Sequence, residues 1–225
     1  MVNTIVDEYE GVIDKYTGDG VMALFGAPIG RSDDPQRAVL AALAIDKRMR
    51  QLCLELAAEK LPNPDVGIGV NTSRVVAGNI GSPSRLNYTV LGDGVNLASR
   101  LESLTKRYRV PIIVGEQTAS AARNLAYLEL DKVRVRGKTT AVRIFQPLGM
   151  ADQLDSATRE LADRHHRALA LFRARSWIAA EDIFRALAIT PGYARIAEIY
   201  VGYLGEFTVN DPGADWDGAF TLSEK

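Results

Sequence analysis

The sequence has a single cysteine, Cys53, among its 225 residues. One thiol excludes a framework of internal disulfides and is typical of a protein that works in a reducing compartment. The chain also has no uninterrupted apolar run of the roughly 20 residues that a transmembrane helix needs. It shows no N-terminal signal peptide either. These absences predict a soluble chain in the cytoplasm, with no membrane segment of its own.

The sequence has no excess of positive or of negative charge. The 27 Lys and Arg residues balance 28 Asp and Glu residues, which leaves a formal net charge of −1. Because the two signs are interspersed, no basic stripe indicates a nucleic-acid-binding surface, and nucleic acid is not an expected partner. The length and a hydrophobic content of 47% suit one medium-sized domain with an appendage, and they suffice for a core.

The periodicity of apolar residues predicts strands and helices that follow one another irregularly. The expected elements are a helix end within 1–10, a hairpin within 12–25, a helix from 33 to about 60, strands at 65–72, 74–80 and 88–91, a helix ending at about 108, a strand at 111–115, a helix at 116–124, and strands at 128–136 and 140–147. Strands interleaved with helices and hairpins indicate an α+β sandwich rather than a regularly alternating parallel sheet.

The composition changes at Gly149. Residues 149–155 read as a linker, residues 156–206 as a helical segment and residues 207–225 as a tail. Within the helical segment, residues 168–187 predict two antiparallel helices that join near Ser176. The helical segment resembles one tetratricopeptide-type hairpin, and a single unit cannot bury a solenoid core. Helices that pack on the preceding domain, or on a dimer mate, are therefore favoured over a free-standing peptide receptor.

Two polar residues, Asn96 and Arg100, lie four positions apart in a predicted helix, so both point the same way. An amide beside a guanidinium can hold a ribose and a polyphosphate, because the planar fork of arginine donates to two oxygens at once. The competing interpretation is an ordinary solvated pair on a helix surface.

A glycine-rich turn at residues 17–20 joins two apolar runs and predicts a hairpin. This hairpin places Asp19 at its tip and Lys15 at the end of its first strand. The competing interpretation is ordinary turn chemistry, because Asp and Gly are common in hairpin turns.

Together and in this order, the two stretches closely resemble the catalytic domain of class III adenylate and guanylate cyclases. The resemblance includes the segments Gly67–Thr72 and Val75–Ser82 and covers the chain as far as Leu148. It implies a ferredoxin-like α+β cyclase sandwich that converts ATP to cyclic AMP and pyrophosphate. It also implies two Mg²⁺ or Mn²⁺ ions for each complete site. The expected assembly is a head-to-tail dimer, either a homodimer or a heterodimer with another cyclase protomer, in which both chains build each site.

The resemblance assigns roles to three residues around the base and the metal. Asp19 matches the second of two metal-binding aspartates. Lys15 matches the lysine that reads adenine, and Thr89 matches the residue that reads the exocyclic amine. Guanylate cyclases usually carry Glu and Cys at these two base-reading places. Lys and Thr therefore imply ATP as the substrate.

Further roles concern the ribose and the phosphates. Asn96 matches the asparagine that orients the ribose, and Arg100 matches the arginine that stabilises the transition state. Arg136 falls where many relatives have a triphosphate-binding lysine, with Lys138 as the alternative. In this family both metal aspartates come from one protomer, whereas the lysine, threonine, asparagine and arginine come from the other.

One part of the family pattern has no match. The family usually opens with a strand that ends in Phe-x-Asp and carries the first metal aspartate, and Asp7 is no substitute because it lies in the leading helix. We therefore expect a catalytic domain that lacks its first strand and is inactive alone. The tail resembles the ending of bacterial cyclases with an upstream CHASE-type sensor, so the full-length product would be anchored in the inner membrane.

Three alternatives to an adenylate cyclase remain. The first is a non-enzymatic pseudo-cyclase that pairs with intact cyclases, and an in-frame Phe-x-Asp segment upstream of Met1 would argue against it. The second is a guanylate cyclase, which Lys15 and Thr89 oppose. The third is a diguanylate cyclase, which is disfavoured because its acidic Gly-Gly hairpin signature is missing.

Overall fold

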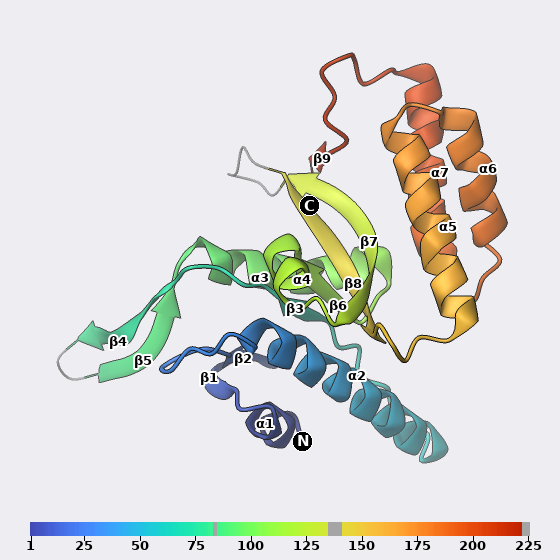
Figure 1. Ribbon diagram of the computed structural model, residues 1–225. Coiled ribbons are helices and arrows are strands. Elements are labelled where there is room, and N and C mark those ends of the chain that lie inside the picture. Colours follow the sequence, from blue (N-terminus) through green and yellow to red (C-terminus); the bar gives the residue numbers. More distant parts are fainter. Residues whose placement is uncertain (83–84, 135–140, 222–225) are drawn as a thin grey trace.

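The computed structural model describes residues 1–82, 85–134 and 141–221. None of the helices in these ranges has the length and apolar character that crossing a membrane requires. The elements follow one another as in Figure 1: α1 (Val2–Glu8), β1 (Val12–Thr17), β2 (Gly20–Leu24), α2 (Asp34–Ala58), β3 (Ile68–Val70), β4 (Val76–Ser82), β5 (Arg85–Leu91), α3 (Asp93–Tyr108), β6 (Ile112–Gly115), α4 (Glu116–Ala121), β7 (Leu125–Arg134), β8 (Val142–Met150), α5 (Ser156–Arg173), α6 (Trp177–Leu187), α7 (Ala194–Val209) and β9 (Phe220–Thr221).

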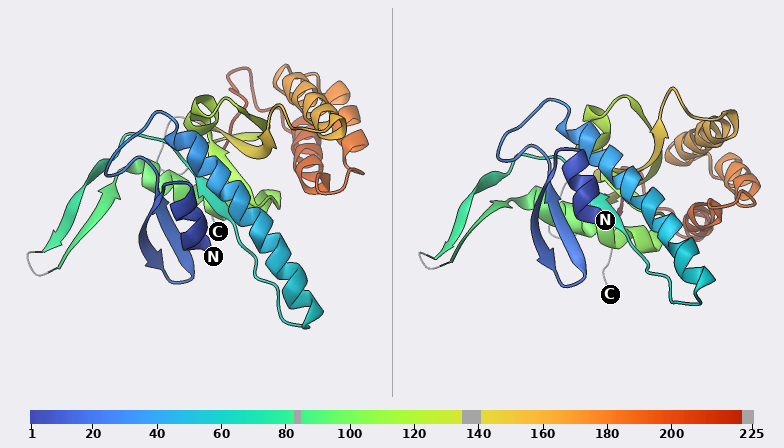
Figure 2. Two further views of the ribbon diagram at one scale, coloured as in Figure 1. Left: turned by 60° about the horizontal axis from the view of Figure 1, so that its bottom comes forward. Right: turned by 90° about the horizontal axis from the view of Figure 1, so that it is seen from below.

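The strands within these ranges form three separate sheets. The largest has the order β3-β6-β8-β7-β9, and the other two are the hairpins β1–β2 and β4–β5. Strand β8 is antiparallel to both of its neighbours, whereas β3 and β9 run parallel to their partners. The β4–β5 hairpin extends away from the rest of the molecule (Figure 2). This irregular interleaving of strands and helices is the predicted α+β class.

Helix α2 covers one face of the five-stranded sheet. Successive side chains of a strand point to opposite faces, so Ile112 and Val114 of β6 pack with Val39 of α2, whereas Ile113 joins the opposite core. The C-terminal half of α2 extends beyond the sheet, and Leu54 there is 74% exposed. The predicted long amphipathic helix is therefore present, but only its first half is anchored.

The other face is covered by α3 and by the bundle of α5, α6 and α7 (Figure 1). Leu101 of α3, Leu130 of β7 and Phe172 of α5 belong to one continuous buried cluster. Within the bundle, the rings of Phe184 and Tyr200 stack with centroids 4.5 Å apart. The C-terminal helices thus share a core with the sheet, which is the packing that the sequence favours over a free-standing receptor.

Strand β7 has an irregularity after Glu129, where Leu130 has no Cα partner on β8. The bundle supplies partners for the released backbone groups. His165 Nε2 contacts the Glu129 carbonyl at 2.5 Å, and the Glu129 amide donates to His166 Nε2 at 3.2 Å. The Tyr200 hydroxyl donates to the Leu130 carbonyl at 2.7 Å. Two adjacent histidines of α5 therefore provide hydrogen-bond partners for both the amide and the carbonyl of Glu129.

The tail returns to the free edge of β7, where β9 adds a short parallel strand. Just before β9, the Asp217 carboxylate accepts from Arg134 Nη2 at 2.8 Å and from Lys132 Nζ at 3.2 Å. These contacts cover an otherwise open sheet edge.

Candidate active site

The β1–β2 hairpin closes in a two-residue turn. Thr17 pairs with Gly20, and Gly18 adopts φ +66°, a conformation that glycine reaches without strain. Asp19 lies at the exposed tip, as predicted. The sequence predicts Lys15 at the end of the first strand, but in the structure it lies inside β1. The reason is that the tight turn allows β1 to continue to Thr17.

Strand β1 contains one residue more than its partner strand opposes. Ile13 pairs with Ala23 and Lys15 pairs with Met22, so Asp14 is left without a Cα partner. Such a bulge changes the direction of a side chain that would otherwise alternate along the strand. Asp14 Oδ2 lies 3.3 Å from Lys15 Nζ, and the Asp14 side chain is only 1% exposed.

Strand β5 brings Thr89 to the same carboxylate. The Thr89 hydroxyl is buried and donates to Asp14 Oδ2 at 2.8 Å, across 75 positions of sequence and between two different sheets. The predicted base-reading residues, Lys15 and Thr89, therefore meet through Asp14, a residue for which the sequence predicted no role. A sequence signal existed, because aspartate is disfavoured inside strands and Asp14 directly precedes the candidate lysine.

Helix α3 carries the candidate ribose and transition-state residues. It begins at Asp93, just after β5 ends at Leu91, so the strand that holds Thr89 leads directly into it. Asp93 in its first turn complements the positive end of the helix dipole. Asn96 is exposed and Arg100 is half-buried, one helical turn apart on the same face. This spacing is the one that the sequence predicts.

Gly69 of β3 sets how closely α3 approaches the sheet. A Cβ atom at this position would overlap the Ala98 carbonyl oxygen and the Glu102 amide nitrogen of α3. Because both atoms belong to helix backbone, neither can move aside without the helix. Glycine at this position therefore fixes the depth of the helix that carries Asn96 and Arg100.

The metal ligands are incomplete in the described part of the chain. Asp19 offers one exposed carboxylate, a hard oxygen ligand of the type that Mg²⁺ prefers. No group of three or more His, Cys, Asp or Glu side chains that could hold a metal ion occurs within residues 1–82, 85–134 and 141–221. These residues alone do not fit a two-metal site. Arg136 and Lys138, the candidate triphosphate ligands, lie outside the described residues.

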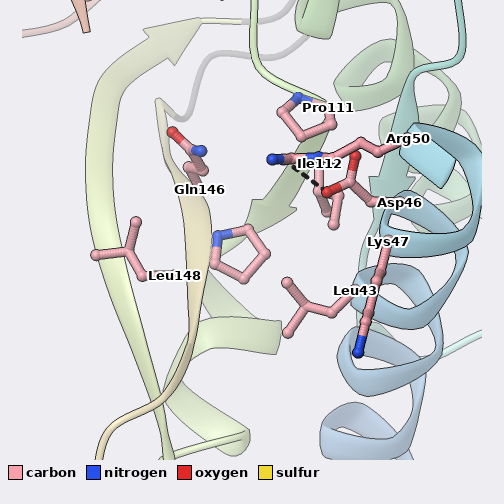
Figure 3. Close-up of a pocket in the computed structure, with 9 residues that line it drawn as sticks. Leu43, Asp46, Lys47, Arg50, Pro111, Ile112, Gln146 and Leu148 are labelled. Atoms are coloured by element: carbon pink, nitrogen blue, oxygen red, sulfur yellow. Dashed lines mark ion pairs between the residues drawn. The ribbon is translucent and has the colours of Figure 1, made fainter. Parts of the chain in front are cut away.

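A hollow of about 300 Å³ lies elsewhere, between α2 and the sheet (Figure 3). Asp46 and Arg50 form an ion pair at 2.8 Å along its wall. Its lining consists of Leu43, Asp46, Lys47, Arg50, Pro111, Ile112, Gln146, Pro147 and Leu148. None of the candidate site residues contributes to it, so Lys15, Thr89 and Asn96 do not share this hollow.

Over residues 2–146 the chain matches the family described as the adenylate and guanylate cyclase catalytic domain, and it belongs to that family of lyases. Similar proteins include the adenylate cyclase of Anabaena cylindrica, 41% identical over 149 residues, and adenylate cyclase 1 of Rhizobium meliloti, 28% identical over 151 residues. The matches cover 63% and 67% of this chain, but only 29% and 23% of those proteins.

Solved structures agree on the fold. The adenylyl cyclase CyaB from P. aeruginosa matches with a TM-score of 0.62 and 31% identity, over 68% of this chain and 80% of that chain. The guanylyl cyclase Cya2 matches with a TM-score of 0.61 and 31% identity, over 68% of this chain and 78% of that chain. Because one of these structures is an adenylyl cyclase and the other a guanylyl cyclase, the overall fold does not distinguish between adenine and guanine nucleotides as the substrate.

Proposed function

We propose that this chain is the catalytic domain of an adenylate cyclase, which converts ATP to cyclic AMP and pyrophosphate in a head-to-tail dimer. The observation that carries the proposal is the meeting of Lys15 and Thr89 at one buried carboxylate. An ammonium group only donates hydrogen bonds, so Lys15 suits the unprotonated ring nitrogen of adenine and opposes the N–H group of guanine. Relatives that are named adenylate cyclases support the same choice.

In the proposed reaction, the ribose 3′ oxygen forms a bond to the α-phosphorus while the bond to the departing pyrophosphate breaks. Asn96 orients the ribose. Arg100 donates to the phosphate oxygens on which negative charge develops, a preorganised charge of the kind that accounts for much of catalysis. A single helix holds both side chains at a fixed spacing, which supports their joint role. Arg136 is the proposed triphosphate ligand, with Lys138 as the alternative.

Members of this family generally use divalent metal ions. Asp19 is the proposed contribution of this chain to a pair of Mg²⁺ or Mn²⁺ ions in each complete site. One carboxylate cannot hold two ions that each require several oxygen ligands. We therefore expect the chain alone to form little or no cyclic AMP.

The chain spans less than a third of the length of the two adenylate cyclases named above. Its domain boundaries and its place in a longer protein are therefore also part of the proposal. We assign residues 1–148 to the catalytic domain, 149–155 to a linker, 156–206 to a tetratricopeptide-like helical segment and 207–225 to the tail. The proposed place of the domain is the cytoplasm, where ATP is available, with anchoring through a sensor module elsewhere in the full-length product.

The experiment that tests this function mixes the chain with a full-length cyclase protomer of the same family. That partner has its own ribose-orienting asparagine and transition-state arginine changed to Ala, and it supplies the two metal aspartates. This chain supplies Lys15, Thr89, Asn96 and Arg100. Cyclic AMP is measured from ATP and Mn²⁺, after sedimentation has established that a heterodimer forms.

We expect neither protein to be active alone, and activity to appear on mixing. The activity should fall about a hundredfold or more when Arg100→Ala removes the transition-state charge. Arg167→Ala is the matched control, because this arginine is exposed on α5 in the bundle. A confirmed heterodimer that forms no cyclic AMP would defeat the assignment.

One observation favours a second candidate, a pseudo-cyclase that regulates intact cyclases as a dimer partner. Asp19 has no cluster of further acidic ligands in the described parts of the chain. A regulatory partner would need the dimer surface and not the metals. In the mixing experiment this candidate predicts a change in the activity of an unmodified cyclase, and no rescue of the partner that carries the two Ala substitutions.

A further inference from the structure

The buried carboxylate of Asp14 joins Lys15 and Thr89, but the proposed function gives it no part in choosing the base. We propose that Asp14 fixes the direction in which the Thr89 hydroxyl hydrogen-bonds, and thereby makes the site select adenine over guanine. The proposal rests on the proposed function, because it concerns the same base-reading pair. It makes Asp14 a positioning residue, which acts through Thr89 and Lys15 and does not itself touch the nucleotide.

The bulge in β1 determines where the Asp14 side chain lies. The bulge leaves Asp14 without a Cα partner, and its side chain turns away from solvent toward the β4–β5 hairpin. A bulge costs a regular pair of ladder bonds, so it persists where the redirected side chain gains a partner. Here the gained partners are the Thr89 hydroxyl at 2.8 Å and Lys15 Nζ at 3.3 Å.

The direction of the Thr89 bond follows from the chemistry of its partner. A carboxylate accepts hydrogen bonds and has no proton to give, whereas a hydroxyl has one proton and two lone pairs. Because Thr89 gives its only proton to Asp14, its oxygen can only accept from any other neighbour. It therefore suits the exocyclic amine of adenine, which donates. The carbonyl that guanine presents at the same place would face a second acceptor with no proton between them.

The same carboxylate also positions Lys15. An ammonium group has three donors, so a contact with Asp14 still leaves donors for a ring nitrogen of the base. The Lys15 side chain is 44% exposed, and a long flexible side chain in that setting loses less entropy on binding if it is already held. Asp14 thus links the donor and the acceptor that adenine requires.

The test uses Asp14→Asn in the mixed dimer described above, with kcat/KM measured separately for ATP and GTP. The variant keeps the size of the side chain, but its amide nitrogen can donate to Thr89 and leave the hydroxyl proton free to point at a carbonyl. The ratio of kcat/KM for ATP to that for GTP should fall about tenfold, which is the scale of one misdirected hydrogen bond. Asp14→Ala, which removes both contacts, should lower the same ratio.

Asp152→Asn is the matched control, because it makes the same chemical change at an exposed turn after β8. A second readout needs no nucleotide. Urea unfolding of wild type, Asp14→Ala, Thr89→Val and the double variant forms a cycle that measures the bond itself, because alanine at position 14 cannot make a replacement bond to Thr89. We expect the two substitutions to be coupled by about fivefold in the unfolding equilibrium constant.

The two readouts separate the outcomes. A coupled pair together with a lowered ATP preference supports the proposal. A coupled pair with an unchanged ratio would reduce Asp14 to a structural contact, and an additive cycle would remove the bond on which the argument depends. If the wild-type mixed dimer neither binds nor turns over ATP or GTP, the proposed function fails. The selecting role of Asp14 then falls with it, whatever the unfolding cycle gives.

Discussion

The hydroxyl of Tyr108 donates to Asp131 Oδ2 at 2.7 Å and so joins the last turn of α3 to β7. Tyr203 of α7 approaches the same carboxylate oxygen at 3.4 Å, and Arg107 donates to the Tyr203 hydroxyl at 2.9 Å. The helix that carries the candidate catalytic residues is thus held at its far end by the sheet and the bundle together. Burial raises the pKa of Asp131 to about 6, partly offset by the bond from Tyr108.

This shift makes a prediction about stability and pH. The pKa of Asp131 is raised from an ordinary 3.8, so between about pH 4 and 6 the folded state binds more protons than the unfolded state. The free energy of unfolding therefore falls as pH rises through this window. Burial lowers the pKa of His165 from 6.5 to about 3, so its contribution has the opposite sign and rises with pH there. In the wild type the two contributions oppose each other.

We expect Asp131→Asn to expose the histidine contribution, so that the free energy of unfolding increases between pH 4 and 6 by more than in wild type. His165→Gln should leave the Asp131 contribution, so that the free energy of unfolding falls with rising pH by more than in wild type. Each slope is at most about 1.4 kcal/mol per pH unit for one proton. Urea unfolding at a series of pH values measures both differences. Profiles that run parallel to wild type in both variants would contradict the assignment.

A second prediction concerns the contact between Gly69 and α3. Gly69→Ala should lower the free energy of unfolding by about 3 kcal/mol, because the new methyl group meets helix backbone that cannot rotate away. Gly202→Ala is the matched control. This glycine lies exposed within α7, and a Cβ there has no neighbour within 4 Å. It should raise stability by about 0.5–1 kcal/mol through helix propensity. Equal effects of the two substitutions would show that Gly69 does not limit the approach of α3.

A third prediction tests how the bundle is held on β7. Tyr200→Phe removes the only proton donated by that side chain to the Leu130 carbonyl and keeps the ring that stacks on Phe184. A buried carbonyl without a partner costs about 1–3 kcal/mol, so thermal or urea unfolding should show a loss of that size. Tyr127→Phe serves as the comparison, because its hydroxyl makes a longer bond, 3.3 Å, at a half-buried position. If Tyr127→Phe lowers the free energy of unfolding by as much, the irregularity in β7 does not account for the contribution of the Tyr200 bond to stability.

Much of the candidate site could be predicted from the local sequence pattern. The i and i+4 spacing of Asn96 and Arg100 and the hairpin tip at Asp19 depend on residues that are close in sequence, and the structure has them as expected. The strand boundaries differ from the prediction: β5 begins at Arg85 and not at 88, and β8 continues to Met150 and not to 147, beyond the predicted domain end at 148. Strand ends depend on pairing with distant partners, which a local pattern does not contain.

The residues that the sequence missed act across long separations. Asp14 and Thr89 are 75 positions apart, and their bond depends on a bulge that no periodicity predicts. Similarly, His165 and His166 of α5 contact the backbone of Glu129, which is 36 and 37 positions away, and both contacts form at an irregularity in β7. Such contacts arise where regular pairing fails, so sequence rules built on regular periods do not find them.

The final prediction concerns an exchange of base preference in the mixed dimer. Lys15→Glu with Thr89→Cys introduces the pair that guanylate cyclases usually carry, and it replaces a donor at the base edge by an acceptor. The structure adds a condition to this exchange. The carboxylate that Lys15→Glu introduces would stand beside the buried Asp14 carboxylate, which now lies 3.3 Å from Lys15 Nζ, and two adjacent carboxylates repel each other.

We therefore expect the double variant to lose ATP turnover and to gain little GTP turnover. Adding Asp14→Asn removes the like charge, and this triple variant should turn over GTP with a kcat/KM about tenfold above that of the double variant, the scale of one charge-pair interaction. The measurement is kcat/KM for both nucleotides in wild type and in the two variants. Equal GTP turnover in the double and triple variants would mean that Asp14 does not act on the residue at position 15. An unchanged ratio of ATP to GTP turnover throughout would mean that Lys15 does not read the base.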